Sequence, residues 1–228
     1  MSTESLQQTA EAIKSAGMLK SNVPVISLFP PPPPNASKEK LSQASRYLAL
    51  DCEMVGVGPG GLDSALARVS AVNFHGQVLL DVYVKSPEKV VDYRTAVSGI
   101  KPGHITPSHE GSEVNQFGQQ LLSLRQVQDL VAPLLKGKLV IGHSLRNDFK
   151  ALMLSTSMNL RRDTSHYAPF RKLADGKSPS LKLLAAQVLG VQIQENVHDS
   201  VEDARIAMLL YRAVKKEWES RNFTKQSK

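Results

Sequence analysis

Two acidic side chains, Asp51 and Glu53, stand inside the otherwise apolar run RYLALDCEMV. Successive side chains of a strand point to opposite faces, so both acids are expected on one face, with Leu50 and Cys52 on the other. Two like charges held close together beside an apolar core are unfavourable unless a cation compensates for them. The pair therefore indicates either a bound divalent cation or a strand end where the acids are solvated, and alone it does not decide between them.

A third acid, Asp148, follows the apolar run KLVIG and the residues HSLRN. Open α/β sheets place ligand sites beyond the carboxyl ends of their strands, so Asp148 is a candidate site residue. The simpler explanation of Asp148 alone is an aspartate stabilised by the dipole at the start of a helix. His143, at the end of the same run, is better explained by one ordinary hydrogen bond than by metal ligation.

The segment HDSVED brings a histidine and an acid to the start of the last expected helix. Ser200 is a good candidate for the N-cap, which places Asp203 in the first turn and His198 just outside it. His198 and Asp203 are therefore expected close together. A capping arrangement beside an exposed loop histidine explains the same residues without any chemistry.

A sheet and helices must bring these candidate residues together, and the apolar periodicity of the chain predicts both. The turn His75-Gly76-Gln77 separates two of the strands, so the first three strands are expected to form a meander. Strands followed by alternating strands and helices indicate an α/β protein with a mixed sheet. The expected strands are 46–55, 67–74, 78–85 and 138–142, and the expected helices are 121–135, 148–154, 180–189 and 200–219.

Composition divides the chain into three parts. Residues 1–45 are polar and contain the consecutive prolines Pro30 to Pro34, which favour an extended, flexible arm that is either a linker or a docking site for a proline-binding module. Residues 46–219 are expected to form one folded domain, and residues 220–228 a short polar tail.

Charge and cysteine content restrict the class of protein. The net charge of +7 and the pI near 9.5 favour an anionic partner, although a basic soluble protein without such a partner has the same charge. Cys52 is the single cysteine, which excludes an intrachain disulfide and a cysteine-rich zinc site. No run approaches the ~20 apolar residues of a spanning helix, and the N-terminus has no secretory pattern, so we expect a soluble, intracellular protein without a membrane partner.

Together the three motifs resemble a known family. Asp-x-Glu on the first strand, His-x4-Asp after a later strand and a second His-x4-Asp at the start of the last helix form the pattern of DEDDh 3′→5′ exonucleases. The segments YLALDCEMVGVGPGG, YRTAVSGIKPGHI and HDSVEDARIAMLLYR are similar, more narrowly, to the RNA exonuclease 4 branch, which is associated with ribosomal RNA processing. The similarity runs in the same order from about Arg46 to Glu217.

The resemblance implies a ribonuclease H-like mixed sheet flanked by helices, with an exonuclease domain over residues 46–219. It also implies two divalent cations, Mg²⁺ or Mn²⁺, with His198 as general base and nucleoside 5′-monophosphates as products. Two such cations can stabilise both the attacking water and the leaving oxygen, which is a reason for four carboxylates to converge. The implied metal ligands are Asp51, Glu53, Asp148 and Asp203, and His198 completes the implied catalytic set.

Contacts to the terminal nucleotide are also implied by the resemblance, for residues near the first strand and in the loop around residue 99. Strand alternation favours core packing as the explanation of Met54, and the same explanation is open for Ile100. The implied substrate-binding residues are Met54, Ser98, Gly99, Ile100 and His143.

Partners and location follow from the resemblance as well. It implies a monomeric enzyme in the nucleus, in particular the nucleolus, that acts on single-stranded RNA 3′ ends of pre-rRNA, with pre-ribosomal proteins as further partners. A DNA exonuclease of the repair or proofreading type would share all five catalytic residues, and preference for a 2′-hydroxyl distinguishes the two. A catalytically silent RNA-binding assembly factor is the third alternative, although a pure binder has no need to gather four acids where phosphates should lie.

Overall fold

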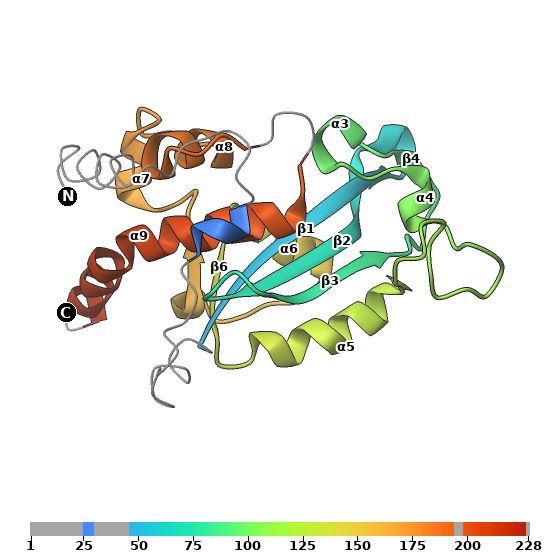
Figure 1. Ribbon diagram of the computed structural model, residues 1–228, viewed down its shortest axis with the longest axis horizontal. Coiled ribbons are helices and arrows are strands. Elements are labelled where there is room, and N and C mark those ends of the chain that lie inside the picture. The colour runs from blue at the N-terminus through green and yellow to red at the C-terminus, as the bar shows by residue number, and fades with distance from the viewer. Residues whose placement is uncertain (1–24, 30–45, 194–197, 227–228) are drawn as a thin grey trace.

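The computed structural model describes residues 25–29, 46–193 and 198–226 of the chain. In this described part, seven strands form one mixed sheet in the order β5-β3-β2-β1-β6-β7, with the short β4 paired to β1 (Figure 1). The α/β class expected from the sequence is confirmed. The strands are β1 (Tyr47–Val57), β2 (Asp63–Asn73), β3 (Val78–Val84), β4 (Val90–Asp92), β5 (Leu121–Leu122), β6 (Leu139–Gly142) and β7 (Arg161–Asp163).

Strands β1, β2 and β3 form the expected antiparallel meander. Gly76, in the turn between β2 and β3, has a φ of 74°, a left-handed conformation that glycine adopts without steric cost. On its other side β1 pairs in parallel with β6, which pairs in parallel with β7. Strand β1 therefore lies inside the sheet, with neighbours along both edges.

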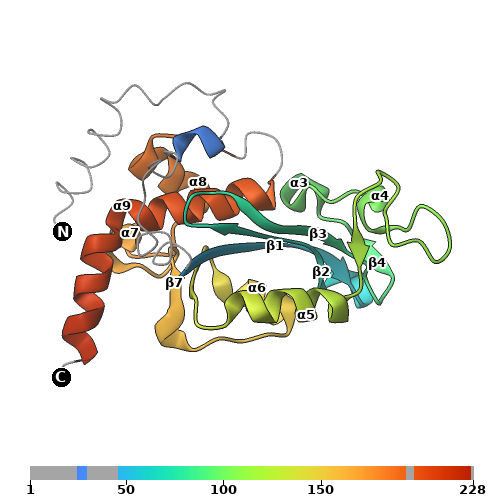
Figure 2. The same cartoon turned by 60° about the horizontal axis from the view of Figure 1, so that its bottom comes forward.

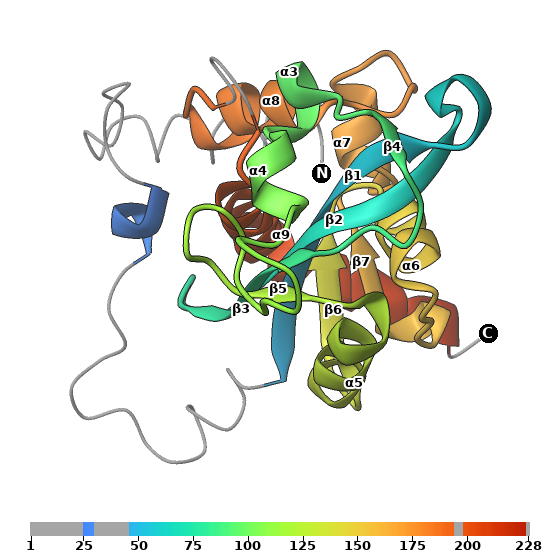
Figure 3. The same ribbon diagram turned by 90° about the vertical axis from the view of Figure 1, so that its right-hand side faces the viewer.

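Helices cover both faces of the sheet, as Figure 2 shows. Helices α8 and α9 and the π-helical turn η4 pack on one face, and helices α5 and α6 pack on the other. Short helices α3 and α4 lie near the end of the sheet where β4 pairs with β1 (Figure 3). The α-helices are α3 (Thr95–Ser98), α4 (Pro102–Ile105), α5 (Leu124–Leu135), α6 (Leu145–Leu152), α7 (Ala168–Lys172), α8 (Leu181–Leu184) and α9 (Ser200–Gln226); the other helical turns are η1 (Val25–Leu28), η2 (Pro59–Gly61), η3 (Met158–Leu160) and η4 (Ala185–Leu189).

Helix α5 begins later than the sequence pattern indicates. Ser123 caps it by accepting a hydrogen bond from the backbone of Gln126, whose side chain in turn accepts one from the Ser123 backbone. Leu121 and Leu122 instead form β5, which pairs in parallel with β3 at the edge of the sheet. The expected helical start at residue 121 is therefore wrong, because pairing with β3 outweighs the local periodicity.

Part of the expected flexible arm 1–45 packs on the domain. The turn η1 lies against α9, with Val25, Leu28 and the following Phe29 all buried in the core on that face. The rest of the arm, including the proline run, lies outside the described residues.

At the other end, α9 continues to Gln226 through most of the expected polar tail 220–228. Among the residues that the structure describes, none of the helices combines the length and the apolar character that a membrane crossing requires.

Candidate active site

The two acids of β1 lie on the face of the sheet that α9 covers. Ala49, at an alternate position, belongs to the core beneath α9, whereas Leu50 and Cys52 belong to the core on the α5 and α6 side. The expected alternation along β1 is therefore confirmed. Burial, followed by the charge of Asp148, raises the pKa of Asp51 well above its ordinary value.

Glu53 is the more buried of the two acids, with 6% of its surface exposed. Burial raises its pKa from 4.5 to about 8, and the charge of Asp203 adds to this increase, whereas Arg68 opposes it. Within the described residues, its Oε1 atom is buried without a hydrogen-bond partner. A buried carboxylate oxygen without a donor is costly, so its position calls for a proton or a cation.

Helix α6 delivers Asp148 to the edge of β1. Between Ala49, the last β1 residue that pairs with β6, and Gly56, the first that pairs with β4, this edge of β1 has no strand neighbour among the described residues. There the Asp148 carboxylate accepts hydrogen bonds from the backbone N–H and the thiol of Cys52. Burial raises the pKa of Asp148 from 3.8 to about 7, against the lowering effect of hydrogen bonds from its own backbone N–H and from Cys52. The Asp148 carboxylate thus binds the β1 edge where no strand pairs with it, next to the two β1 acids.

A close approach of backbone at Gly142 allows this placement. A Cβ atom at Gly142 would lie 2.9 Å from the carbonyl oxygen of Leu50 and would collide with the Leu145 side chain. Gly142 ends β6, and Leu145 begins α6. Glycine therefore lets the start of α6 press against β1.

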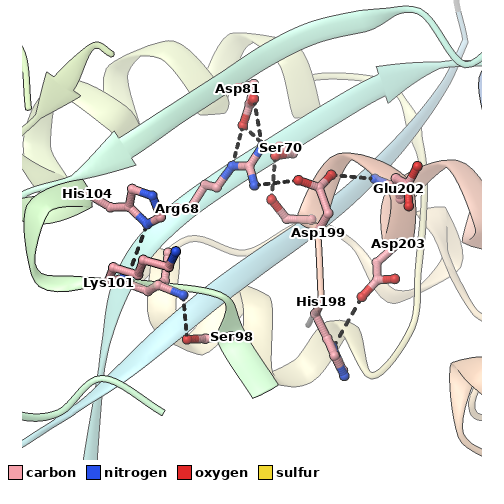
Figure 4. Close-up of polar contacts among 12 residues, drawn as sticks. Arg68, Ser70, Asp81, Ser98, Lys101, His104, His198, Asp199, Glu202 and Asp203 are labelled. Atoms are coloured by element: carbon pink, nitrogen blue, oxygen red, sulfur yellow. Dashed lines mark hydrogen bonds and ion pairs between the residues drawn. The ribbon is translucent and has the colours of Figure 1, made fainter. Parts of the chain in front are cut away.

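The first turn of α9 carries Asp203, which is 4% exposed, and His198 lies just before the helix. The Nδ1 atom of His198 is 3.3 Å from Oδ2 of Asp203 (Figure 4). Asp199, not Ser200, caps the helix, because its Oδ1 accepts a hydrogen bond from the Glu202 backbone at 3.1 Å. Ser200 is fully buried instead, with its Oγ 2.6 Å from Oγ of another serine on β2.

Three of these side chains could share one metal ion. Glu53, His198 and Asp203 each offer a ligand atom, and these atoms lie within 4.8 Å of one another. The unpartnered Oε1 of Glu53 and the raised pKa values of the neighbouring acids fit a divalent cation with oxygen ligands. Asp51 and Asp148 lie outside this group but interact with it electrostatically. All five implied catalytic residues are therefore gathered at one place.

Two of the implied nucleotide-binding residues, Ser98 and Ile100, are buried rather than exposed to a substrate. Ile100 is 1% exposed and lies in a small core cluster, and Ser98 is 4% exposed. The Ser98 hydroxyl donates to the carbonyl of Tyr93 and accepts from the backbone of Ile100, while Gly99 ends α3 with a left-handed φ of 68°. These residues shape the loop from inside.

Met54 and His143 also have internal contacts. Met54 is partly buried against the core on the α5 and α6 side, in line with the packing explanation. The Nδ1 atom of His143 is 2.8 Å from Oγ1 of Thr164, and burial lowers the pKa of His143, which favours the neutral ring.

One exposed apolar residue beside the site has no counterpart among the residues inferred from the sequence. Val97 is 59% exposed, and its carbonyl accepts a hydrogen bond from the backbone N–H of His198 at 3.3 Å. Its position immediately before Ser98 in the sequence was the available signal, whereas no local pattern predicts its exposure.

Comparison with known proteins defines the class. Residues 48–211 match the exonuclease family model named RNase T, and the chain belongs to this family. It is 49% identical over 186 residues to RNA exonuclease 4 of Saccharomyces cerevisiae, a match that covers 81% of this chain and 59% of that protein. It is 48% identical over 176 residues to RNA exonuclease 4 of Homo sapiens, covering 77% of this chain and 39% of that protein. The chain thus spans less than two thirds of the length of these relatives.

Solved structures agree on the fold. The Saccharomyces cerevisiae Pan2 pseudoubiquitin hydrolase–RNA exonuclease module, in complex with AAGGAA RNA, superposes with a TM-score of 0.65 at 30% identity, over 81% of this chain and 31% of that one. The Neurospora crassa Pan2 catalytic unit gives a TM-score of 0.64 at 29% identity, over 80% and 29% of the two chains. The ribonuclease H-like fold expected from the sequence is confirmed.

Proposed function

We propose that this chain is a metal-dependent 3′→5′ exoribonuclease that releases nucleoside 5′-monophosphates. The observation that carries the proposal is the unpartnered, buried Oε1 of Glu53, with ligand atoms of His198 and Asp203 close by. A pure binding protein gains nothing from such an oxygen, whereas a metal-dependent hydrolase needs it. The family match and the relatives named RNA exonuclease 4 support the reaction and the substrate class.

In the proposed mechanism the four acids hold two divalent cations, Mg²⁺ or Mn²⁺. When bound, such cations supply a polarised water and charge stabilisation for the leaving oxygen. Their ligands would be Asp51, Glu53, Asp148 and Asp203.

His198 is the proposed general base. Its side chain is 34% exposed, while that of Asp203 is 5% exposed. The ring can therefore take a proton from water at the site and release it to solvent. Asp203, whose Oδ2 lies 3.3 Å from Nδ1 of His198, orients the ring.

The proposed substrate is the 3′ end of single-stranded RNA, in particular pre-rRNA, and the proposed location is the nucleolus. The net charge of +7 supports a polyanionic substrate, and the Pan2 module was solved with RNA. The ribosomal and nucleolar parts of the proposal rest on the resemblance to RNA exonuclease 4. Northern analysis of pre-rRNA after depletion of the protein, together with fluorescence imaging of a tagged copy, tests both.

Digestion of matched 5′-labelled RNA and DNA tests the activity. The purified protein is assayed with Mg²⁺, with Mn²⁺ and with chelator, beside the variant Asp203→Ala. We expect a metal-dependent ladder shortened from the 3′ end, faster on RNA and absent in the variant. A faster ladder on DNA would assign the chain to DNA repair or proofreading, and the absence of any ladder with retained RNA binding would identify an assembly factor.

A further inference from the structure

Arg68 is a nearly buried arginine that joins two acids from different parts of the fold. Its Nε and Nη2 atoms donate to Oδ1 and Oδ2 of Asp81 on β3 at 2.8 and 2.9 Å. Its Nη1 atom donates to Oδ2 of Asp199 at 2.9 Å (Figure 4). Only 12% of the Arg68 side chain is exposed. The guanidinium is thus fixed from both ends and bridges the sheet to the start of α9.

The position of Arg68 in the sheet places it beside the candidate metal site. In the register of β1 and β2, Arg68 lies directly opposite Glu53. Side chains of directly opposed residues in an antiparallel pair lie on the same face. Arg68 and Glu53 therefore share the face that α9 covers.

Asp199 transmits this contact to the residues of the proposed chemistry. It follows His198 directly, and its carbonyl oxygen accepts the backbone N–H of Asp203 at 2.8 Å. One oxygen of its carboxylate caps α9 and the other accepts from Arg68. The position of Asp199 therefore sets the position of the residues on either side of it.

A pair of serines adds a second link between the same elements. Ser70 on β2 donates to Oδ1 of Asp81 at 2.8 Å, and its Oγ lies 2.6 Å from Oγ of Ser200. Asp81 consequently receives hydrogen bonds from both Arg68 and Ser70, each of which also contacts the first turn of α9. These contacts form a continuous network from β3 through β2 to α9, which we call the Arg68 clamp: Arg68, Ser70, Asp81, Asp199 and Ser200.

We propose that Arg68 is a positioning residue, which through Asp199 holds His198 and Asp203 over Glu53. It does not act on the substrate itself. The inference rests on the proposed nuclease function for its kinetic test, but not for its structural and metal-binding tests. Residues that orient metal ligands from outside typically contribute ~10- to 100-fold to activity or metal affinity.

The variant Arg68→Lys separates charge from geometry. Lysine keeps the positive charge, but its single ammonium cannot make a bidentate contact to Asp81 and reach Asp199 in the same way. We expect kcat to fall by ~10- to 100-fold while KM for RNA changes less than about threefold. We also expect the increase in Tm produced by Mn²⁺ to shrink, a readout that needs no turnover.

The chain offers a matched control at the far end of α9. Arg162, whose side chain is 8% exposed, donates to both carboxylate oxygens of Glu219 at 2.8 and 2.6 Å. Arg162→Lys therefore disturbs a bidentate ion pair between β7 and the same helix, with an arginine about as buried as Arg68, without touching the Arg68 clamp. It should lower Tm but leave kcat and the Mn²⁺ effect unchanged.

Hydrogen exchange distinguishes positioning from general destabilisation. In Arg68→Lys, the backbone amides of residues 199–206 should exchange faster than in the wild type, whereas in Arg162→Lys they should not. A second variant, Asp199→Asn, keeps a good N-cap but removes the charged acceptor of the Arg68 hydrogen bond. It replaces Arg68→Lys in these measurements if that variant does not fold. If Arg68 acts through Asp199, the double variant loses little more kcat than the more impaired single variant.

Two results would overturn the inference. One is an Arg68→Lys protein with wild-type kcat, hydrogen exchange and Mn²⁺ response. The other is an Arg162→Lys protein that has the same Tm as Arg68→Lys and loses kcat to the same extent. A wild-type protein inactive on both RNA and DNA would instead refute the proposed function, and the exchange and Mn²⁺ measurements would still decide the role of Arg68.

Discussion

The Nδ1 atom of His198 lies 3.3 Å from Oδ2 of Asp203, and the two residues flank the cap of the same helix. Asp203 is buried whereas His198 is partly exposed. The His198 ring is thus partly exposed to solvent and also contacts a buried acid of the candidate metal site. This arrangement suits proton transfer between water at the site and bulk solvent.

The first prediction concerns this histidine. His198→Ala should lower kcat by ~10²- to 10⁴-fold, the range for a positioned acid–base group, because Glu53 and Asp203, whose ligand atoms lie nearest to it, are both buried. Single-turnover digestion of labelled RNA measures the rate. Mn²⁺ should still raise Tm in the variant, since the four acids are intact. A loss of less than about fivefold would move the general-base role to another residue.

The second prediction concerns the buried carboxylate of Glu53. Glu53→Gln keeps the shape of the side chain but removes its charge, so it should abolish hydrolysis and weaken the Mn²⁺-induced rise in Tm. In chelator at pH 8.5 the same variant should be more stable than the wild type, because a buried like charge is removed from the cluster. Glu88→Gln, at an exposed loop position, is the control and should change neither property. Lower stability of Glu53→Gln in chelator would contradict the electrostatic argument.

The third prediction is a pH dependence of stability without metal. The folded-state pKa values of Glu53, about 8, and Asp148, about 7, lie above their ordinary values of 4.5 and 3.8. The folded protein therefore binds more protons than the unfolded chain between these limits, and this contribution to stability is full below about pH 4 and is lost as pH rises through 7 to 8. Metal ions replace the protons, so the Tm increase produced by Mg²⁺ or Mn²⁺ should be larger at pH 8 than at pH 6.

Thermal unfolding in chelator and in metal, from pH 5 to 8.5, checks this dependence. The double variant Glu53→Gln with Asp148→Asn is the reference, because its remaining titrating groups are those of the wild type. The difference in Tm between the two proteins should grow with pH in chelator. Parallel profiles would show that these two carboxyl groups do not control the pH response.

The alternation along β1 was predictable because it depends only on the twofold period of a strand. The apolar residues of RYLALDCEMV leave one face for Asp51 and Glu53, and helix α9 then covers that face. The acids from α6 and α9 could be assigned only through the family resemblance, since each taken alone is explained by a helix N-terminus.

Other features depend on tertiary contacts that no local pattern carries. Ser200 is a good capping residue by type, but burial against Ser70 takes its hydroxyl away, and Asp199 caps the helix instead. In the sequence Arg68 is a single charged residue in a strand, and its two acidic partners cannot be predicted locally because they lie 13 and 131 positions further along the chain. Local sequence therefore predicts which side chains share a face more readily than which distant residues support them.

The last prediction tests how closely α6 must approach β1. Gly142→Ala adds a methyl group 2.9 Å from the Leu50 carbonyl oxygen, so the start of α6 must move away from the strand. We expect a loss of ~1–3 kcal/mol in the free energy of unfolding, as for overpacked cores, together with reduced activity because Asp148 moves with the helix. Chemical denaturation and the RNA assay measure the two effects. Gly137→Asn is the control: a Cβ there meets no atom within 4 Å, and asparagine tolerates its left-handed φ of 68°. If Gly142→Ala were as stable and active as this control, Asp148 would not depend on the close contact between β6, α6 and β1.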